Sequence, residues 1–205
     1  MKNTSPGGEL SSRHRNWTIR AVLLAALVAV GSAGSGCGGD DDAGGPKSAL
    51  TLAEAKQPLT DAPRQLVALR EQANELLEED LQSFEARLKD LEGTPVVINK
   101  WASWCGPCIF EFPQFQRAAI ERGNEVAFIG LNSGDVPAAA RTFLRDLPVP
   151  YPSYSDPDQE LARAIGADQL PSTIFIDDRG EIVETKFGPY ETTEELLADI
   201  DRLFG

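Results

Sequence analysis

Two cysteines, Cys105 and Cys108, stand three positions apart with Gly106 and Pro107 between them, in the segment WASWCGPC. A pair at this spacing serves dithiol–disulfide exchange, half of a metal site, or a structural bridge. A four-cysteine metal site lacks two ligands here, because the only other cysteine is Cys37, far upstream. A structural bridge across so short a loop removes little entropy from the unfolded chain. The spacing therefore favours a redox-active pair.

The scarcity of histidine excludes several classes of active site. The only histidine of the chain is His14, close to the N-terminus and within the predicted leader. The rest of the chain therefore cannot build a Ser-His-Asp or Cys-His nucleophile, nor a zinc site that includes histidine. We expect no metal and no cofactor, so Cys105 and Cys108 remain as the groups for chemistry.

The segments around the pair place it between a strand and a helix. The β-branched run at 95–101, PVVINKW, predicts a strand buried on both faces, and 105–122 predicts a helix with Pro107 in its first turn. The positive partial charge at a helix N-terminus lowers the pKa of a thiol there and populates the thiolate, which is the nucleophile. Cys105 is thus the predicted attacking cysteine. Cys108, one turn further along, is predicted to resolve the mixed disulfide.

The remaining periodicities predict an α/β domain with the order strand-helix-strand, a helix-rich middle, then strand-strand-helix. Residues 172–177 and 181–187 are joined by so short a turn that they are expected to pair antiparallel. Within 64–91 we predict two helices with a break near Glu79, although residues 75–79 also suit a short edge strand. The other expected elements are a strand at 125–132, helices at 137–147 and 157–166, an extended segment at 148–156, and a helix at 193–204.

The N-terminal part of the chain has a different composition. Residues 1–36 combine basic residues, a short apolar run and a small-residue stretch, which predicts a signal peptide. Cys37 follows in a context that resembles the lipobox of bacterial lipoproteins, which predicts lipidation; a leader that is retained as an anchor or simply cleaved remains the alternative. Residues 37–63 are rich in Gly, Asp and Pro and predict a flexible tether. The folded domain is then expected over 64–205.

The chain is acidic, with a formal net charge of −13. Such a surface repels phosphate backbones and anionic lipid head groups. We therefore expect no nucleic-acid partner and no polybasic docking to a membrane.

Three stretches together resemble one family. WCGPC, Pro113 in the helix that follows, and QLPSTIFID about sixty residues later are similar to the thioredoxin superfamily, and over roughly residues 80–205 most similar to its TlpA/ResA family. That resemblance implies a thioredoxin-like fold with a central mixed sheet flanked by helices. It also implies a membrane-tethered thiol-disulfide oxidoreductase outside the cytoplasm, with protein disulfides as substrates and a membrane thiol carrier as electron donor. A role in cytochrome c maturation is a further implication.

The resemblance also implies roles for single residues. Pro171 is expected to be cis and to pack against the two cysteines, with Leu170 offering its backbone to an extended substrate. Trp104 is expected to cover the disulfide, with Gly106 and Pro107 also in the substrate-binding surface. Glu111 is implicated as an acid that tunes the thiols or relays a proton, in place of the acid missing at Asn99. The alternative for Glu111 is a solvated side chain in the first turns of a helix.

Some choices stay open at this point. The Gly-Pro pair between the cysteines favours a reductase, whereas a disulfide oxidase or isomerase, a thiol peroxidase of the same superfamily, and a non-enzymatic binding module are the alternatives. We expect a monomer. Lys100 interrupts the apolar strand, and we expect its stem to carry the ammonium group out to solvent at the strand end.

Overall fold

The structure of the protein is a computed structural model, and it describes residues 48–205. The predicted leader, residues 1–36, and the predicted lipidation site, Cys37, lie outside the described residues.

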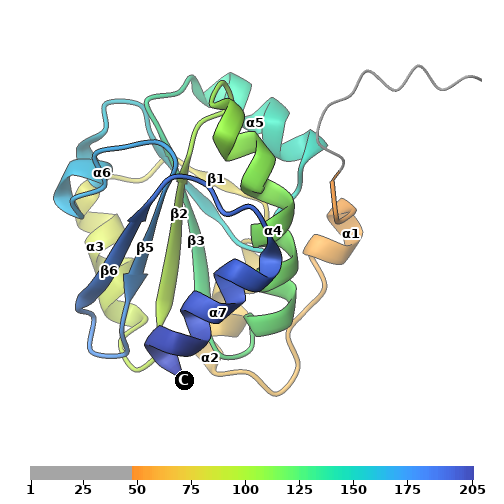
Figure 1. The fold of residues 1–205 in the computed structure, drawn as a ribbon, viewed down its shortest axis with the longest axis vertical. Helices are drawn as coiled ribbons and strands as arrows, with labels where there is room; N and C mark the ends of the chain where they lie inside the picture. The colour runs from red at the N-terminus through yellow and green to blue at the C-terminus, as the bar shows by residue number, and fades with distance from the viewer. Residues whose placement is uncertain (1–47) are drawn as a thin grey trace, which may run out of the picture. The chain divides into compact units, whose positions relative to one another are not determined.

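A six-stranded sheet forms the centre of the described part, in the order β1-β4-β3-β2-β5-β6 (Figure 1). Strands β1, β4, β3 and β2 run parallel to one another, whereas β5 is antiparallel to β2 and β6 is antiparallel to β5. The strands are β1 (Leu76–Leu77), β2 (Val96–Trp101), β3 (Ala127–Ser133), β4 (Ser153–Asp156), β5 (Ser172–Ile176) and β6 (Ile182–Phe187).

Helices cover both faces of this sheet, and α4 and α7 lie side by side in front of it in Figure 1. One core cluster joins α4, α5 and α7 to the sheet, and a second joins α2, α3 and α6 to its other face. The helices are α1 (Leu52–Ala55), α2 (Arg64–Glu71), α3 (Leu81–Asp90), α4 (Gly106–Arg122), α5 (Pro137–Asp146), α6 (Glu160–Ala164) and α7 (Thr193–Phe204).

The middle strand β2 supplies side chains to both faces. All six of its residues are buried, as expected for a strand with neighbours on both edges and helices on both faces. Because side chains alternate along a strand, Asn99 points toward α4 and Lys100 toward the opposite face. The carboxyl end of β2 leads directly to the cysteine pair at the start of α4.

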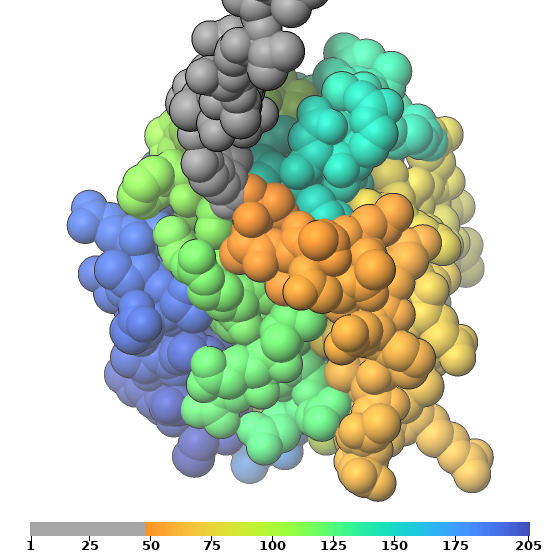
Figure 2. Space-filling view, turned by 90° about the vertical axis from the view of Figure 1, so that its right-hand side faces the viewer, coloured from red at the N-terminus to blue at the C-terminus, as the bar shows by residue number. Residues whose placement is uncertain are grey.

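Residues 48–62, here called the N-terminal strap, pack against the body of the domain. The main-chain N–H of Ala49 donates to Gln116 of α4 at 2.8 Å, and Ala55 is fully buried. Figure 2 shows the strap, in orange, lying against α4, in green. This differs from the flexible tether predicted for 37–63, because apolar residues spread through the polar sequence find partners on the domain. Residues 37–47 lie outside the described residues.

The predicted α/β fold is confirmed, including the antiparallel pairing of β5 with β6. The expected helix at 157–166 is shorter and spans only α6, after Gln159 in a left-handed conformation. For residues 75–79 the strand alternative is confirmed, since Leu76 and Leu77 form β1 and pair parallel with β4.

Candidate active site

The two cysteines form a disulfide at the N-terminus of α4. Cys105 and Cys108 are bonded to each other, with a Cα–Cα distance of 5.2 Å. Cys105 is the N-cap of α4, in an extended backbone conformation, and Pro107 occupies the first turn as expected. The main-chain N–H of Cys108 donates to Sγ of Cys105 at 3.3 Å. The field of the helix N-terminus therefore acts directly on the sulfur of Cys105.

The two cysteines differ in exposure to solvent. Cys105 is 6 % exposed, whereas Cys108 is completely buried. Gly106 and Pro107 between them are exposed, and open space surrounds the position where a Cβ on Gly106 would lie. A partner thus reaches the pair from the side of Cys105.

The loop before the pair is fixed by a carboxylate from the end of β3. Asp135 accepts hydrogen bonds from the N–H of Ser103 at 2.6 Å and from its Oγ at 3.0 Å. Asn132 and the N–H of Val136 donate to the same carboxylate. Burial raises the pKa of Asp135, but the hydrogen bonds from Asn132 and Ser103 outweigh it and leave this pKa below its usual value. Asp135 therefore holds the loop as an anion.

Trp104 is the exposed side chain next to the pair. It is 63 % exposed, and its Nε1 donates to the main-chain oxygen of Gly134 at 3.1 Å. This bond ties the indole to the loop after β3 and leaves a large apolar surface beside Cys105. Trp104 is thus exposed, while the role predicted for it over the disulfide stays a prediction.

The peptide bond between Leu170 and Pro171 is cis, as predicted. Leu170 packs against the core cluster that contains both cysteines. The main-chain oxygen of Pro171 accepts a hydrogen bond from Gly188 at 3.0 Å. The structure therefore brings the Leu170–Pro171 segment to the same end of the domain as the cysteines.

Glu111 is fully buried one turn after Cys108 on α4, so the alternative of a solvated side chain is wrong. Its Oε1 accepts a hydrogen bond from Asn99 of β2 at 2.7 Å, and its Oε2 accepts one from the N–H of Tyr190 at 3.1 Å. Position 99 carries Asn in place of an acid. The amide of Asn99 thus binds Glu111, the acid that is expected to act instead.

Burial raises the pKa of Glu111 to about 7. The hydrogen bonds from Tyr190 and Asn99 and the charge of Lys186 oppose this increase, and burial outweighs them. A carboxyl group with a pKa near neutrality both takes up and releases a proton at physiological pH. Such a group is suited to proton transfer, and Glu111 lies three residues after Cys108 on the same helix.

The expectation that Lys100 reaches solvent is wrong. Lys100 is only 1 % exposed, and its Nζ donates to the main-chain oxygen of Ala167 at 2.6 Å. Its stem extends beneath the loop that leads to Pro171 and not along the strand toward the surface.

Three residues of the site are not predicted from the sequence. Tyr190 acts through its main-chain N–H, for which its residue type gives no signal. Asp135 and Lys186 come from parts of the chain distant from the cysteines. Of the three, only Asp135 could have been found from the sequence. It is an acid just after a predicted buried strand, and functional groups often lie at the carboxyl ends of strands.

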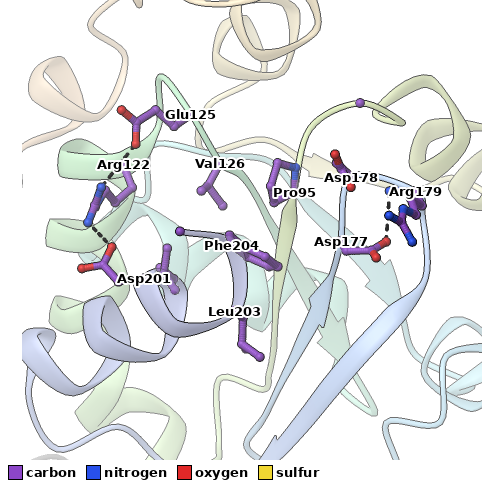
Figure 3. A pocket seen from close by; sticks show the side chains of 13 residues that line it. Pro95, Arg122, Glu125, Val126, Asp177, Asp178, Arg179, Asp201, Leu203 and Phe204 are labelled. Atoms are coloured by element: carbon purple, nitrogen blue, oxygen red, sulfur yellow. Dashed lines mark hydrogen bonds and ion pairs between the residues drawn. The ribbon is translucent and has the colours of Figure 1, made fainter.

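A separate hollow of about 560 Å³ lies at the other end of the sheet (Figure 3). It is lined by Pro95 before β2 and by the last turns of α4 and α7. Among its charged side chains, Arg122 pairs with Glu125 and Asp201. Within residues 48–205, no group of three or more His, Cys, Asp or Glu side chains is arranged to hold a metal ion. No helix among these residues is long and apolar enough to cross a membrane.

Comparison with known proteins shows the family to which the chain belongs. Residues 61–201 match the Redoxin family. The chain is 30% identical over 139 residues to the thiol-disulfide oxidoreductase ResA of Bacillus thuringiensis, covering 66% of this chain and 78% of the relative. It is also 30% identical over 122 residues to ResA of Bacillus subtilis, covering 59% of this chain and 67% of that one.

The fold is similar to solved structures of thiol-exchange proteins. One is a thiol:disulfide interchange protein DsbE from Chlorobium tepidum, with a TM-score of 0.53 and 26% identity, covering 58% of this chain and 85% of that one. Another is dsbF of Mycobacterium tuberculosis, with a TM-score of 0.52 and 28% identity, covering 56% and 84%.

Proposed function

Because this chain belongs to the Redoxin family and is a thiol-disulfide oxidoreductase, we propose that it reduces disulfide bonds of partner proteins through Cys105 and Cys108. The observation that carries this proposal is the disulfide at the N-terminus of α4, where Cys105 keeps a small exposed fraction beside the exposed Gly106 and Pro107 and Cys108 is completely buried. The accessible sulfur meets the partner, and the buried one closes the cycle.

In the first step, the thiolate of Cys105 attacks one sulfur of the partner disulfide. A bond forms between Cys105 and that sulfur, the partner's own S–S bond breaks, and the released partner thiolate takes up a proton. The helix N-terminus stabilises the attacking thiolate of Cys105.

In the second step, the thiol of Cys108 loses its proton, and the resulting thiolate attacks the sulfur of Cys105. The 105–108 disulfide forms, the mixed disulfide breaks, and the second partner thiolate leaves and is protonated. Overall, the partner gains two electrons and two protons, and the cysteine pair loses them. Glu111 accepts the proton of Cys108, since its carboxyl has a pKa near neutrality and lies one turn away on α4.

Leu170 is the proposed docking point for the partner chain. It precedes Pro171 at the end of the domain where Cys105 is accessible, and its backbone can pair with an extended segment that flanks the partner's disulfide. The exposed surfaces of Trp104, Gly106 and Pro107 border the same position. Partner proteins with haem-binding cysteine pairs, as in cytochrome c maturation, are a specific candidate class.

The direction of electron flow is tested by the reduction potential of the cysteine pair. We expect a value near that of thioredoxin, about −270 mV, together with rapid reduction of insulin disulfides. The potential is measured by equilibration with a glutathione buffer, and the redox state of the pair in the cell is read by thiol labelling. A reduction potential of about −120 mV, as found for strong oxidants, together with no reduction of insulin, would instead show that the protein is a disulfide oxidase.

We also propose that the protein works at the outer face of the cell membrane, held by lipid on Cys37. The leader and the cysteine that follows it support this, although both lie outside the described residues. Mass spectrometry of the mature protein is expected to find a diacylglyceryl group on an N-terminal Cys37, and Cys37→Ala is expected to lack it. An unmodified Cys37 in the mature protein rules this anchor out.

A further inference from the structure

Lys100 is a buried cation that the exchange steps do not use. Its side chain lies on the face of β2 opposite to Glu111, and its Nζ donates to the main-chain oxygen of Ala167 at 2.6 Å. Burial lowers the pKa of Lys100, and the nearby carboxylates of Asp156 and Asp168 oppose that decrease. Burying an ammonium group costs free energy unless the group is paired or hydrogen-bonded. The question is therefore what the buried Lys100 does through its hydrogen bond to Ala167.

The carboxylate of Asp156 is engaged with other donors. It accepts hydrogen bonds from the N–H groups of Leu161 and Ala162 at the start of α6, and from Oγ of Ser133. It therefore supplies charge to the surroundings of Lys100, while the hydrogen bond of the ammonium group goes to Ala167. This hydrogen bond joins Lys100 to the main chain at Ala167.

Ala167 begins the segment that ends at Pro171. Its N–H is bonded to Ala162 at 2.9 Å, just after the left-handed Gly166 that ends α6. The far end of the segment is held from the same direction. Ser172 is the cross-strand partner of Lys100, and its Oγ donates to the main-chain oxygen of Gln169 at 3.1 Å.

Directly paired residues of an antiparallel pair of strands lie on the same face of the sheet. Lys100 and Ser172 therefore bind two carbonyl groups of the segment 167–171 from one side. Part of this segment is open to a partner, since Gln169 is exposed and Leu170 is half-buried.

We propose that Lys100 is a positioning residue for partner recognition, which holds the segment 167–171 so that the backbone of Leu170 receives a polypeptide beside Cys105. The proposal rests on the proposed function, in which Leu170 docks the partner chain. The ligand class is an extended polypeptide that flanks a disulfide. A small disulfide reaches Cys105 without using Leu170, so its reaction does not depend on Lys100.

The test replaces Lys100 with Met, which keeps an unbranched stem and removes the charge and the N–H donors. We expect the KM for insulin to rise by about tenfold with little change in kcat, because small displacements of a binding group have large kinetic effects. The rate constant for the small substrate hydroxyethyl disulfide and the reduction potential are expected to stay at the wild-type values. Equal losses with both substrates, or an unchanged KM for insulin, would overturn the proposal.

Arg70 provides a matched control. It is also a buried cation, 7 % exposed, and donates to the main-chain oxygens of Ala119 and Gln57, away from the cysteines. Arg70→Met is expected to lower Tm while leaving the KM for insulin unchanged. A rise in KM equal to that of Lys100→Met would show that general loosening is the cause, and the proposal would fail.

Ser172→Ala offers a smaller change at the other end of the segment. It removes the hydrogen bond to Gln169 and is expected to raise the KM for insulin in the same direction as Lys100→Met. This variant keeps the proposal testable if Lys100→Met does not fold. An unchanged KM for insulin in Ser172→Ala then contradicts the proposal.

Amide hydrogen exchange tests the positioning without any substrate. Residues 167–172 are expected to exchange about tenfold faster in Lys100→Met, or in Ser172→Ala, than in the wild type, whereas Arg70→Met leaves them unchanged. Unchanged exchange in this segment overturns the role of Lys100. A wild-type protein that reduces hydroxyethyl disulfide but not insulin instead contradicts the proposed protein-reductase function, and the exchange data then decide on Lys100 alone.

Discussion

Replacing Cys105 with Ser is expected to abolish insulin reduction, with a loss of at least about a thousandfold, because the attacking sulfur is removed. Replacing Cys108 with Ser has a different result. The first step still proceeds, but no second thiolate releases the partner, so covalent complexes through Cys105 accumulate. The measurement is non-reducing gel electrophoresis of each variant after incubation with oxidised partner, followed by addition of dithiothreitol to dissolve the complexes.

This asymmetry follows from the positions of the two sulfurs. Cys105 is the N-cap of α4 and reachable by a partner, whereas Cys108 is buried within the helix. A Cys105→Ser/Cys108→Ser double variant serves as the control and should trap nothing. Equal trapping by the two single variants would contradict the roles assigned to Cys105 and Cys108.

Replacing Glu111 with Gln is expected to slow the release of the partner by roughly a hundredfold at pH 7, a typical contribution of general acid–base catalysis. The wild-type rate should change with pH around the pKa of Glu111, about 7, and this inflection should be missing in Glu111→Gln. Stopped-flow measurement of the second step between pH 5 and pH 9 provides the profile.

The same substitution should change how folding stability depends on pH. Because burial raises the pKa of Glu111 from 4.5 to about 7, the native state holds this proton more tightly than the unfolded state. The contribution of Glu111 to stability is thus greatest below pH 4.5, falls as the pH rises through about 7, and stays at its lowest value above that pH. The free energy of unfolding of Glu111→Gln should lack this fall, a difference of about 3 kcal/mol at pH 8.

The site can accommodate the amide of a Gln at 111. Oδ1 of Asn99 is buried and has no hydrogen-bond partner among the described residues. Rotation of the Asn99 amide lets this oxygen accept from the new Nε2, while the new Oε1 keeps the bond from Tyr190. Glu121→Gln, at an exposed position of α4, is the control and should change neither profile. An unaltered pH–rate profile in Glu111→Gln would remove Glu111 from the mechanism.

The sequence predicts the position of the cysteine pair well because the signals are local. A buried β-branched strand, an extended N-cap and Pro107 in the first turn all lie within about a dozen residues of Cys105. The antiparallel pairing of β5 with β6 is equally predictable from the sequence, because the turn between the two strands is too short for any other pairing.

The surroundings of the buried charges depend on contacts that local patterns do not encode. Glu111 and the N–H of Tyr190 are 79 positions apart in the chain, and Lys100 and its acceptor on Ala167 are 67 apart. Helical spacing places Glu111 near Cys108 but does not tell whether the carboxyl is solvated. For Lys100, the usual behaviour of a lysine at a strand end predicts exposure, and the loop folded over β2 prevents it.

Two adjacent side chains of β2, Asn99 and Lys100, project to opposite faces of the sheet. Asn99 contacts Glu111 of α4, and Lys100 contacts the loop that leads to Leu170. In the roles proposed above for Glu111 and Lys100, proton transfer and partner docking thus depend on opposite faces of a single strand.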